Sequence, residues 1–92
     1  MANENKVLLV LQAIEEARPI VQAIELDNPD AVVENQPAMI RITSPNKLVV
    51  NAETMEEIIG REWNPQELQL CLITLAGNVD EDYDHFTIYW DN

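Results

Sequence analysis

The segment DEDYDH holds the densest group of potential ligands in the chain. Asp80, Asp82 and Asp84 follow one another at i, i+2 and i+4, the spacing that opens a calcium-binding loop. Asp91 stands where the last ligand of such a loop would fall. The position that needs glycine for the turn is instead His85, and the residues after it read as a strand rather than an exit helix. We therefore interpret the segment as a solvated acidic turn.

Other residues that could carry a reaction are few. His85 is the only histidine, and near the end of an alternating strand a lone imidazole is more often a surface residue than a base. Cys71 is the only cysteine, so no intrachain disulfide can form, and its apolar neighbours predict a small buried thiol. No G-x-S-x-G motif and no glycine-rich loop is present. The sequence offers no catalytic residue and no structural zinc site.

The chain is strongly acidic, with 17 acidic residues against five basic ones and a formal net charge of −12. Such a charge repels phosphate backbones, which makes nucleic acid and anionic membranes poor partners. It favours a partner with a basic docking surface, although plain solubility would explain it equally well. The N-terminal apolar run of five residues is too short for a secretory core or a membrane span, so we expect a cytoplasmic protein.

Length and patterning predict one small domain over residues 1–92 with an ordered core of about 6–90. Hairpins dominate, which favours an α+β domain with three helices on a mostly antiparallel sheet, in the order β-α-β-β-β-α-α-β. An acidic loop or short strand is expected before the last strand. The expected elements are a buried strand at 6–12, a helix at 16–27, strands at 31–36, 38–44 and 48–50, helices at 52–59 and 65–76, and a strand at 85–90.

The stretch NPQELQLCLITLAG has clear end signals for a helix. Asn64 is a good N-cap, Pro65 suits the first helical position, and Glu67 completes a capping box. Trp63 can pack on Leu68 as a hydrophobic staple, and a glycine at the far end suits a C-terminal αL position. We therefore expect a single helix between the asparagine and that glycine.

This expected helix is apolar on two sides. At about 100° per residue, Leu68, Cys71, Leu72 and Leu75 form one stripe that must face the core. The opposite side carries Leu70, Ile73 and Gly77, where a small two-layer domain would normally show water a polar face. Either the fold covers this helix on both sides, or another protein covers the outer patch. The residues alone leave both explanations open.

Two segments resemble a known family. They are IELDNPDAVVE and ETMEEIIGREWNPQELQLCLITLAGNVDED, and the likeness extends from Lys6 to Trp90. The chain resembles the regulatory (effector, or coupling) proteins of bacterial soluble multicomponent diiron monooxygenases. Its short N-terminus differs from the long tail of the methane-type proteins, and it looks most like the phenol hydroxylase component. The roles of such tails are therefore not carried over.

The resemblance implies a protein without cofactor, metal or catalytic residue of its own. It implies binding to the diiron hydroxylase component near its iron site and a change in that enzyme's conformation that promotes coupled hydroxylation. Whether the reductase competes for the same hydroxylase surface is left open. The family helix equivalent to residues 65–76 contributes to docking, so the role is carried onto Leu70, Cys71, Ile73, Thr74, Gly77 and Asn78.

Two other functions remain open at this point. An acidic α+β interaction module could regulate an unrelated enzyme, in which case a pull-down would not be dominated by a diiron hydroxylase. A small cofactor-free enzyme such as an isomerase would need a pocket with a perturbed carboxylate, which only coordinates can reveal.

Overall fold

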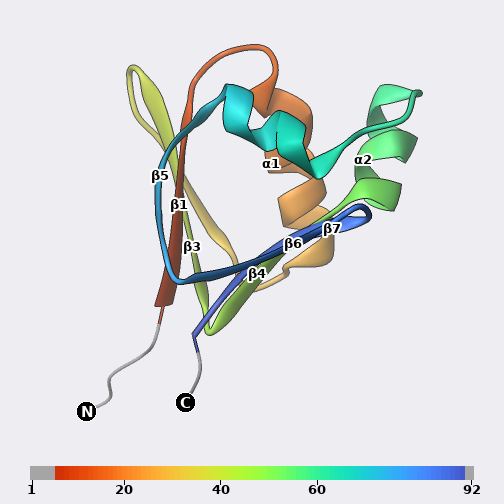
Figure 1. Cartoon of the computed structure of the whole chain (residues 1–92). Coiled ribbons are helices and arrows are strands. Elements are labelled where there is room, and N and C mark those ends of the chain that lie inside the picture. Colours follow the sequence, from red (N-terminus) through yellow and green to blue (C-terminus); the bar gives the residue numbers. More distant parts are fainter. Residues whose placement is uncertain (1–5, 91–92) are drawn as a thin grey trace.

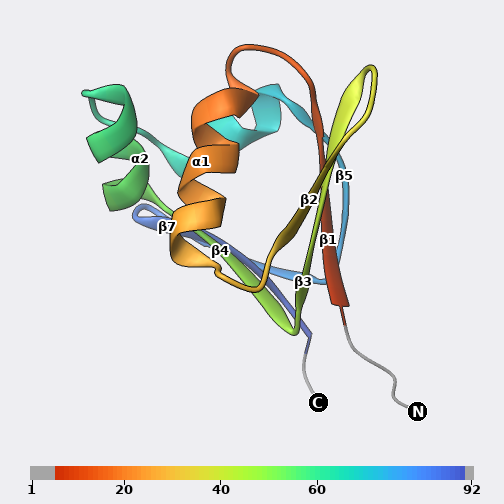
Figure 2. The same ribbon diagram turned by 180° about the vertical axis from the view of Figure 1, so that it is seen from behind.

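A computed structural model describes residues 6–90, which form two antiparallel sheets that meet at an angle with helix α1 between them (Figure 1). The view from behind shows the same arrangement, with α2 beside α1 and away from the first sheet (Figure 2). The elements are β1 (Lys6–Gln12), α1 (Ala17–Asp27), β2 (Val32–Asn35), β3 (Met39–Pro45), β4 (Lys47–Asn51), α2 (Ala52–Ile59), the 3-10 helix η1 (Pro65–Leu70), β5 (Leu72–Ala76), β6 (Asn78–Asp82) and β7 (His85–Tyr89).

The chain passes directly from the first sheet to the second at two corners, and it returns between them through α2 and η1. The first sheet has the order β2-β3-β1-β5 and the second β4-β7-β6, with antiparallel neighbours throughout. Asn46, at a φ of 65°, leads from β3 to β4, and Gly77, at a φ of 136°, leads from β5 to β6. Trp90 joins the sheets here, since its backbone N–H donates to the Asn46 carbonyl (3.1 Å) and its indole N–H to the Lys6 carbonyl (2.8 Å).

The core fills the angle between the two sheets. The apolar run of β1 is the central part of the first sheet, and Val7, Leu9 and Leu11 are fully buried. From the second sheet β7 contributes Phe86 and Ile88, two of the three positions that the alternation of the final strand predicts to be buried. The third, Trp90, lies beyond the end of β7 and is 39% exposed. The predicted strands and the first two helices are therefore confirmed.

Helix α1 ends in a polar clamp on the edge of the second sheet. Asn28 is buried, and its carboxamide donates to the carbonyls of Ile24 (2.9 Å) and Val49 (2.8 Å). Its Oδ1 accepts the Val49 N–H at 2.9 Å. A single side chain thus mimics a neighbouring strand for β4, which has β7 on its other edge. The neighbouring Asp27 carboxylate accepts from Asn51 (3.0 Å) and Thr54 (2.6 Å) at the start of α2.

We expect Asn28→Ala to lower the free energy of unfolding by about 2–3 kcal/mol, because it leaves the part-buried backbone N–H and carbonyl of Val49 without their partners. Urea unfolding followed by far-UV circular dichroism measures the change. Asn35→Ala, at an exposed position of β2, should change it by no more than about 0.5 kcal/mol. An equal effect of both substitutions would contradict the clamp.

The predicted helix at 65–76 is wrong beyond its first six residues. The N-terminal signals hold: the Asn64 side chain accepts from the Gln66 N–H at 2.9 Å, and Glu67 accepts from the Asn64 N–H at 3.2 Å. The helix is of the 3-10 type, however, and ends at Leu70. The residues after Cys71 form β5, and the acidic segment that follows forms β6.

A tertiary interaction explains this difference. Strand β1 has one edge taken by β3 and offers the other, which β5 occupies, and the Gln12 N–H donates to the Cys71 carbonyl at 2.7 Å. The β-branched pair Ile73–Thr74 favours an extended backbone. Gly77 is then a corner between sheets rather than a helix cap. The α+β class is confirmed, and the third helix is present in shortened form. No helix within residues 6–90 is long and apolar enough to cross a membrane.

Candidate docking surface

An apolar ridge runs from the end of η1 along β5. The side chain of Leu70 is 65% exposed and that of Ile73 is 46% exposed, and Thr74 beside it is also exposed. Strand β5 lies at one edge of the first sheet, and no strand among residues 6–90 pairs with its outer edge. We name Leu70, Ile73 and Thr74 the β5 ridge. Of the two explanations that the sequence leaves open, coverage of both apolar members by the fold itself is ruled out, although Ile73 is exposed by a strand and not by the predicted helix.

An irregularity in β5 explains why neighbouring side chains are both exposed. The register with β1 pairs Val10 with Thr74 but Leu11 with Leu72, so Ile73 is the additional residue of a β-bulge. A regular strand would send Ile73 and Thr74 to opposite faces. The bulge instead lets both side chains reach solvent at the edge. The β5 ridge therefore depends on backbone geometry that helical periodicity does not predict.

Cys71 lies under the ridge, not on it. Its side chain is fully buried, with Sγ 3.6 Å from the Leu68 carbonyl oxygen. Burial raises the pKa of the Cys71 thiol, so the group remains a neutral, inert part of the core. A contact between this thiol and a partner would require the ridge to move. Cys71 is therefore not accessible for the direct docking contact that the resemblance implies.

Gly77 and Asn78 lie beyond the far end of the β5 ridge, at the corner between the sheets. A Cβ atom at Gly77 would lie 2.5 Å from Cγ2 of Ile88 and 3.3 Å from Cγ1 of Val7. The glycine is therefore required by close packing and by its positive φ. Asn78 is exposed at the first position of β6. The five residues of β5 span about 17 Å between Leu70 and this corner.

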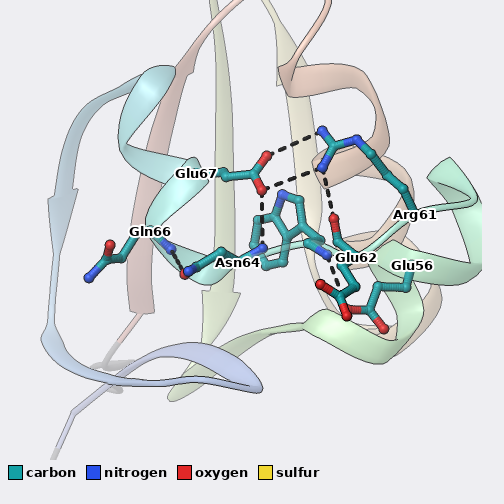
Figure 3. A network of polar contacts seen from close by, with 7 residues as sticks. Glu56, Arg61, Glu62, Asn64, Gln66 and Glu67 are labelled. Carbon is teal, nitrogen blue, oxygen red and sulfur yellow. Dashed lines mark hydrogen bonds and ion pairs between the residues drawn. The ribbon is translucent and has the colours of Figure 1, made fainter.

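A charged network surrounds the start of η1 (Figure 3). Arg61 donates to the Glu67 carboxylate at 3.3 Å and to the Glu62 backbone carbonyl at 2.8 Å. The hydrogen bond from Arg61 lowers the pKa of the partly exposed Glu67 carboxyl below its usual value. Glu56 accepts the backbone N–H of Trp63 at 3.1 Å, which attaches α2 to this segment. The network holds Trp63 in place, with only 5% of it exposed.

A separate groove of about 750 Å³ lies on the outer face of the second sheet. Its lining includes Lys47, Tyr89 and His85. His85 is not a free surface residue, because its Nδ1 is 2.8 Å from Asp84 and its Nε2 is 3.4 Å from Asp80. Asp80 lies on β6, so the predicted acidic turn is partly a strand. These carboxylates raise the pKa of the His85 imidazole, chiefly through the hydrogen bond to Asp84.

The raised pKa predicts a pH dependence of stability. The folded protein stabilises the protonated form of His85. The contribution of this residue to the free energy of unfolding is therefore complete below about pH 6.5 and is lost as the pH rises through the higher pKa of the folded state. NMR titration of the ring should give a pKa above 6.5 that falls in Asp84→Asn. The destabilisation caused by His85→Gln should be larger at pH 6 than at pH 9. A pKa at or below 6.5 would contradict the pairing.

The sequence did not reveal the edge position of β5 or the network at Trp63. The β-branched pair Ile73–Thr74 was a signal for a strand, but the strong cap at Asn64 and the glycine at position 77 favoured a helix. The exposed turn residue Tyr83, 83% exposed, had no sequence signal beyond its place between aspartates.

Comparisons with known proteins agree with this geometry. A relative in Pseudomonas sp. (strain CF600), the phenol 2-monooxygenase stimulatory component DmpM, is 48% identical over 86 residues, which cover 94% of this chain and 96% of the relative. A chain in a solved phenol hydroxylase–regulatory protein complex is 48% identical, with a TM-score of 0.91 over 95% of this chain and 100% of that one.

A third likeness concerns the fold alone. The soluble methane monooxygenase regulatory protein B has a TM-score of 0.74 at 23% identity, over 99% of this chain and 69% of that one. The model of the MmoB/DmpM family matches residues 5–89, nearly the whole chain. The chain therefore belongs to the MmoB/DmpM family.

Proposed function

We propose that this protein is the cofactor-free regulatory component of a phenol or aromatic monooxygenase. It binds the hydroxylase component near its diiron site and shifts that enzyme to a conformation that couples oxygen use to hydroxylation. The observation that carries the proposal is the 0.91 TM-score, at 48% identity, with a chain of a phenol hydroxylase–regulatory protein complex. The protein acts as a single domain, in the cytoplasm, and is not itself a catalyst.

The β5 ridge is the part of the surface that we assign to docking. Leu70 and Ile73 expose apolar area at an unpaired sheet edge, which a partner can cover with a gain in free energy. Thr74 and Asn78 supply polar groups at the rim, and Gly77 fixes the corner between them. The net charge of −12 favours a basic rim on the hydroxylase.

The mechanism is linkage between binding and conformation. A protein without redox chemistry changes another enzyme only by binding one of its conformations more tightly than another. Reversing a 1:99 population needs roughly 5.5 kcal/mol of differential affinity. The coupling is reciprocal, so the hydroxylase state that this protein favours must in turn bind it more tightly. Ridge contacts that form in one hydroxylase conformation alone would supply that difference.

Steady-state turnover tests the proposal. Purified phenol-hydroxylase-type hydroxylase and reductase are titrated with this protein while oxygen consumption and hydroxylated product are measured together. We expect both the rate and the ratio of product to oxygen to rise and then to level off as the hydroxylase is occupied. No change in either quantity across the titration would reject the function for that enzyme.

A further inference from the structure

A pocket of about 370 Å³ lies at the tip of the second sheet, beside the start of η1. Four parts of the chain surround it: α2, the segment after it, η1, and the turn between β6 and β7. Two aromatic side chains take part in its lining, one buried and one exposed. The residues that line it are Glu56, Glu62, Trp63, Asn64, Glu67 and Tyr83.

The two aromatic residues differ in how they are held. Trp63 is almost completely buried, and its backbone is fixed by the 3.1 Å hydrogen bond to Glu56. Tyr83 is 83% exposed at the turn between β6 and β7, and Val79 on the same hairpin is 45% exposed. A tyrosine ring with this exposure has one face free to cover a partner side chain. The pocket thus has a rigid floor and an aromatic wall that lacks a covering group among residues 6–90.

The pocket also carries uncompensated negative charge. Of its three carboxylates, only that of Glu67 forms an ion pair within residues 6–90, with the Arg61 guanidinium at 3.3 Å. The Glu56 carboxylate accepts an uncharged backbone N–H. The Glu62 carboxylate makes no ion pair or hydrogen bond with any group in residues 6–90. Negative charge beside an open aromatic face is complementary to a cation.

The pocket lies beside a second cavity that is lined in part by Leu70 of the β5 ridge. This small neighbouring cavity of about 60 Å³ is lined by Leu70, Arg61, Trp63 and Glu67 among others. Trp63 and Glu67 therefore belong to the linings of both cavities. These two shared residues link the cavity beside Leu70 to the acidic pocket.

We propose that this pocket receives an arginine side chain of the hydroxylase component when the β5 ridge docks. This inference rests on the proposed function and names the partner group at one end of the docking surface. A planar guanidinium can stack on the Tyr83 ring and donate to Glu62 and Glu56 at the same time. The pocket would thereby fix the orientation of the docked protein, while the β5 ridge supplies apolar area.

Two substitutions test the pocket against a matched control. Glu62→Gln removes one charge without a change of shape, and Tyr83→Leu removes the aromatic face but keeps an apolar side chain. Glu25→Gln, at an exposed position of α1, removes the same charge away from the pocket. All three positions are exposed, so we expect the folded state to persist, which circular dichroism checks.

Binding to the purified hydroxylase is measured by isothermal titration calorimetry at several salt concentrations. We expect Kd to rise about tenfold for Glu62→Gln and about fivefold for Tyr83→Leu at low salt, and less than twofold for Glu25→Gln. The difference between Glu62→Gln and wild type should shrink as salt rises.

The outcomes separate this inference from the proposed function. If the wild-type protein binds the hydroxylase but Glu62→Gln and Glu25→Gln raise Kd equally, the pocket contributes only general charge and the inference is overturned. If Tyr83→Leu binds as well as wild type, the aromatic wall has no role and the arginine assignment is overturned. If the wild-type protein itself fails to bind, the proposed function fails and the pocket assignment fails with it.

Discussion

Replacing Leu70 and Ile73 together by aspartate should weaken binding to the hydroxylase by about 100-fold. Leu70 is 65% exposed and Ile73 46% exposed, so a large part of their apolar area is available to a partner. Apolar anchors at the centre of an interface commonly contribute about 1–2 kcal/mol each, and 2.7 kcal/mol corresponds to about 100-fold in Kd. The new carboxylates would also have to be dehydrated on docking, which adds to the loss.

The matched control is Leu26→Asp with Val32→Asp. These side chains, on α1 and β2, are 69% and 56% exposed, and the double substitution adds the same two negative charges. For the control, calorimetric titration should give a Kd within about threefold of the wild-type value. The free energy of unfolding of both double variants should lie within about 1 kcal/mol of the wild-type value. Equal loss of affinity in the two variants would show that charge, not the β5 ridge, controls docking. Unfolding of the Leu70/Ile73 variant would show that these side chains serve the monomer's own fold.

Gly77→Ala should lower the free energy of unfolding by about 3–5 kcal/mol. The backbone φ of 136° is a conformation that residues with a Cβ rarely adopt, and holding such a residue there costs about 1–3 kcal/mol. The added methyl group would lie 2.5 Å from Cγ2 of Ile88, a buried core atom, so the core must shift as well. Overpacking of this kind typically costs about 1–3 kcal/mol more.

Gly60→Ala is the control for this substitution, because it separates strain from packing. Gly60 follows α2 with a φ of 77°, and a Cβ there would meet nothing within 4 Å. We expect Gly60→Ala to lower the free energy of unfolding by about 1 kcal/mol, the usual difference between glycine and alanine at the αL position after a helix. Guanidinium unfolding of both variants gives the comparison. Equal losses would mean that the corner between β5 and β6 tolerates a side chain, contrary to the contacts of Gly77.

Local signals in the sequence predicted most of the elements correctly. The continuous apolar run of β1 identifies a buried central strand, and Pro19 with the DNP segment places the ends of α1. Alternation in HFTIYW correctly assigns Phe86 and Ile88 to the core. The capping box at Asn64 is also present as predicted. Each of these features depends on residues that are neighbours in the chain.

The features of the fold that local signals do not predict depend on pairing between residues that are distant in the sequence. Whether Leu72–Ala76 forms helix or strand depends on the open edge of β1, some sixty residues earlier in the chain. The bulge at Ile73 and the two corners follow from the same pairing. A helical wheel places Leu70 and Ile73 opposite the core but leaves open whether the fold covers them; the structure exposes both, and the wheel does not apply at Ile73. The acidic pocket likewise joins α2 to a turn beyond position 80, a juxtaposition that spacing along the chain does not contain.

Hydrogen–deuterium exchange of the protein with and without the hydroxylase tests the docking claim most directly. If the β5 ridge is the docking surface, the backbone amides of residues 70–76 should exchange at least about tenfold more slowly in the complex. The amides of β2, at the opposite edge of the same sheet, should exchange at an unchanged rate. A hydroxylase that is stimulated by this protein while residues 70–76 show no added protection would contradict the account.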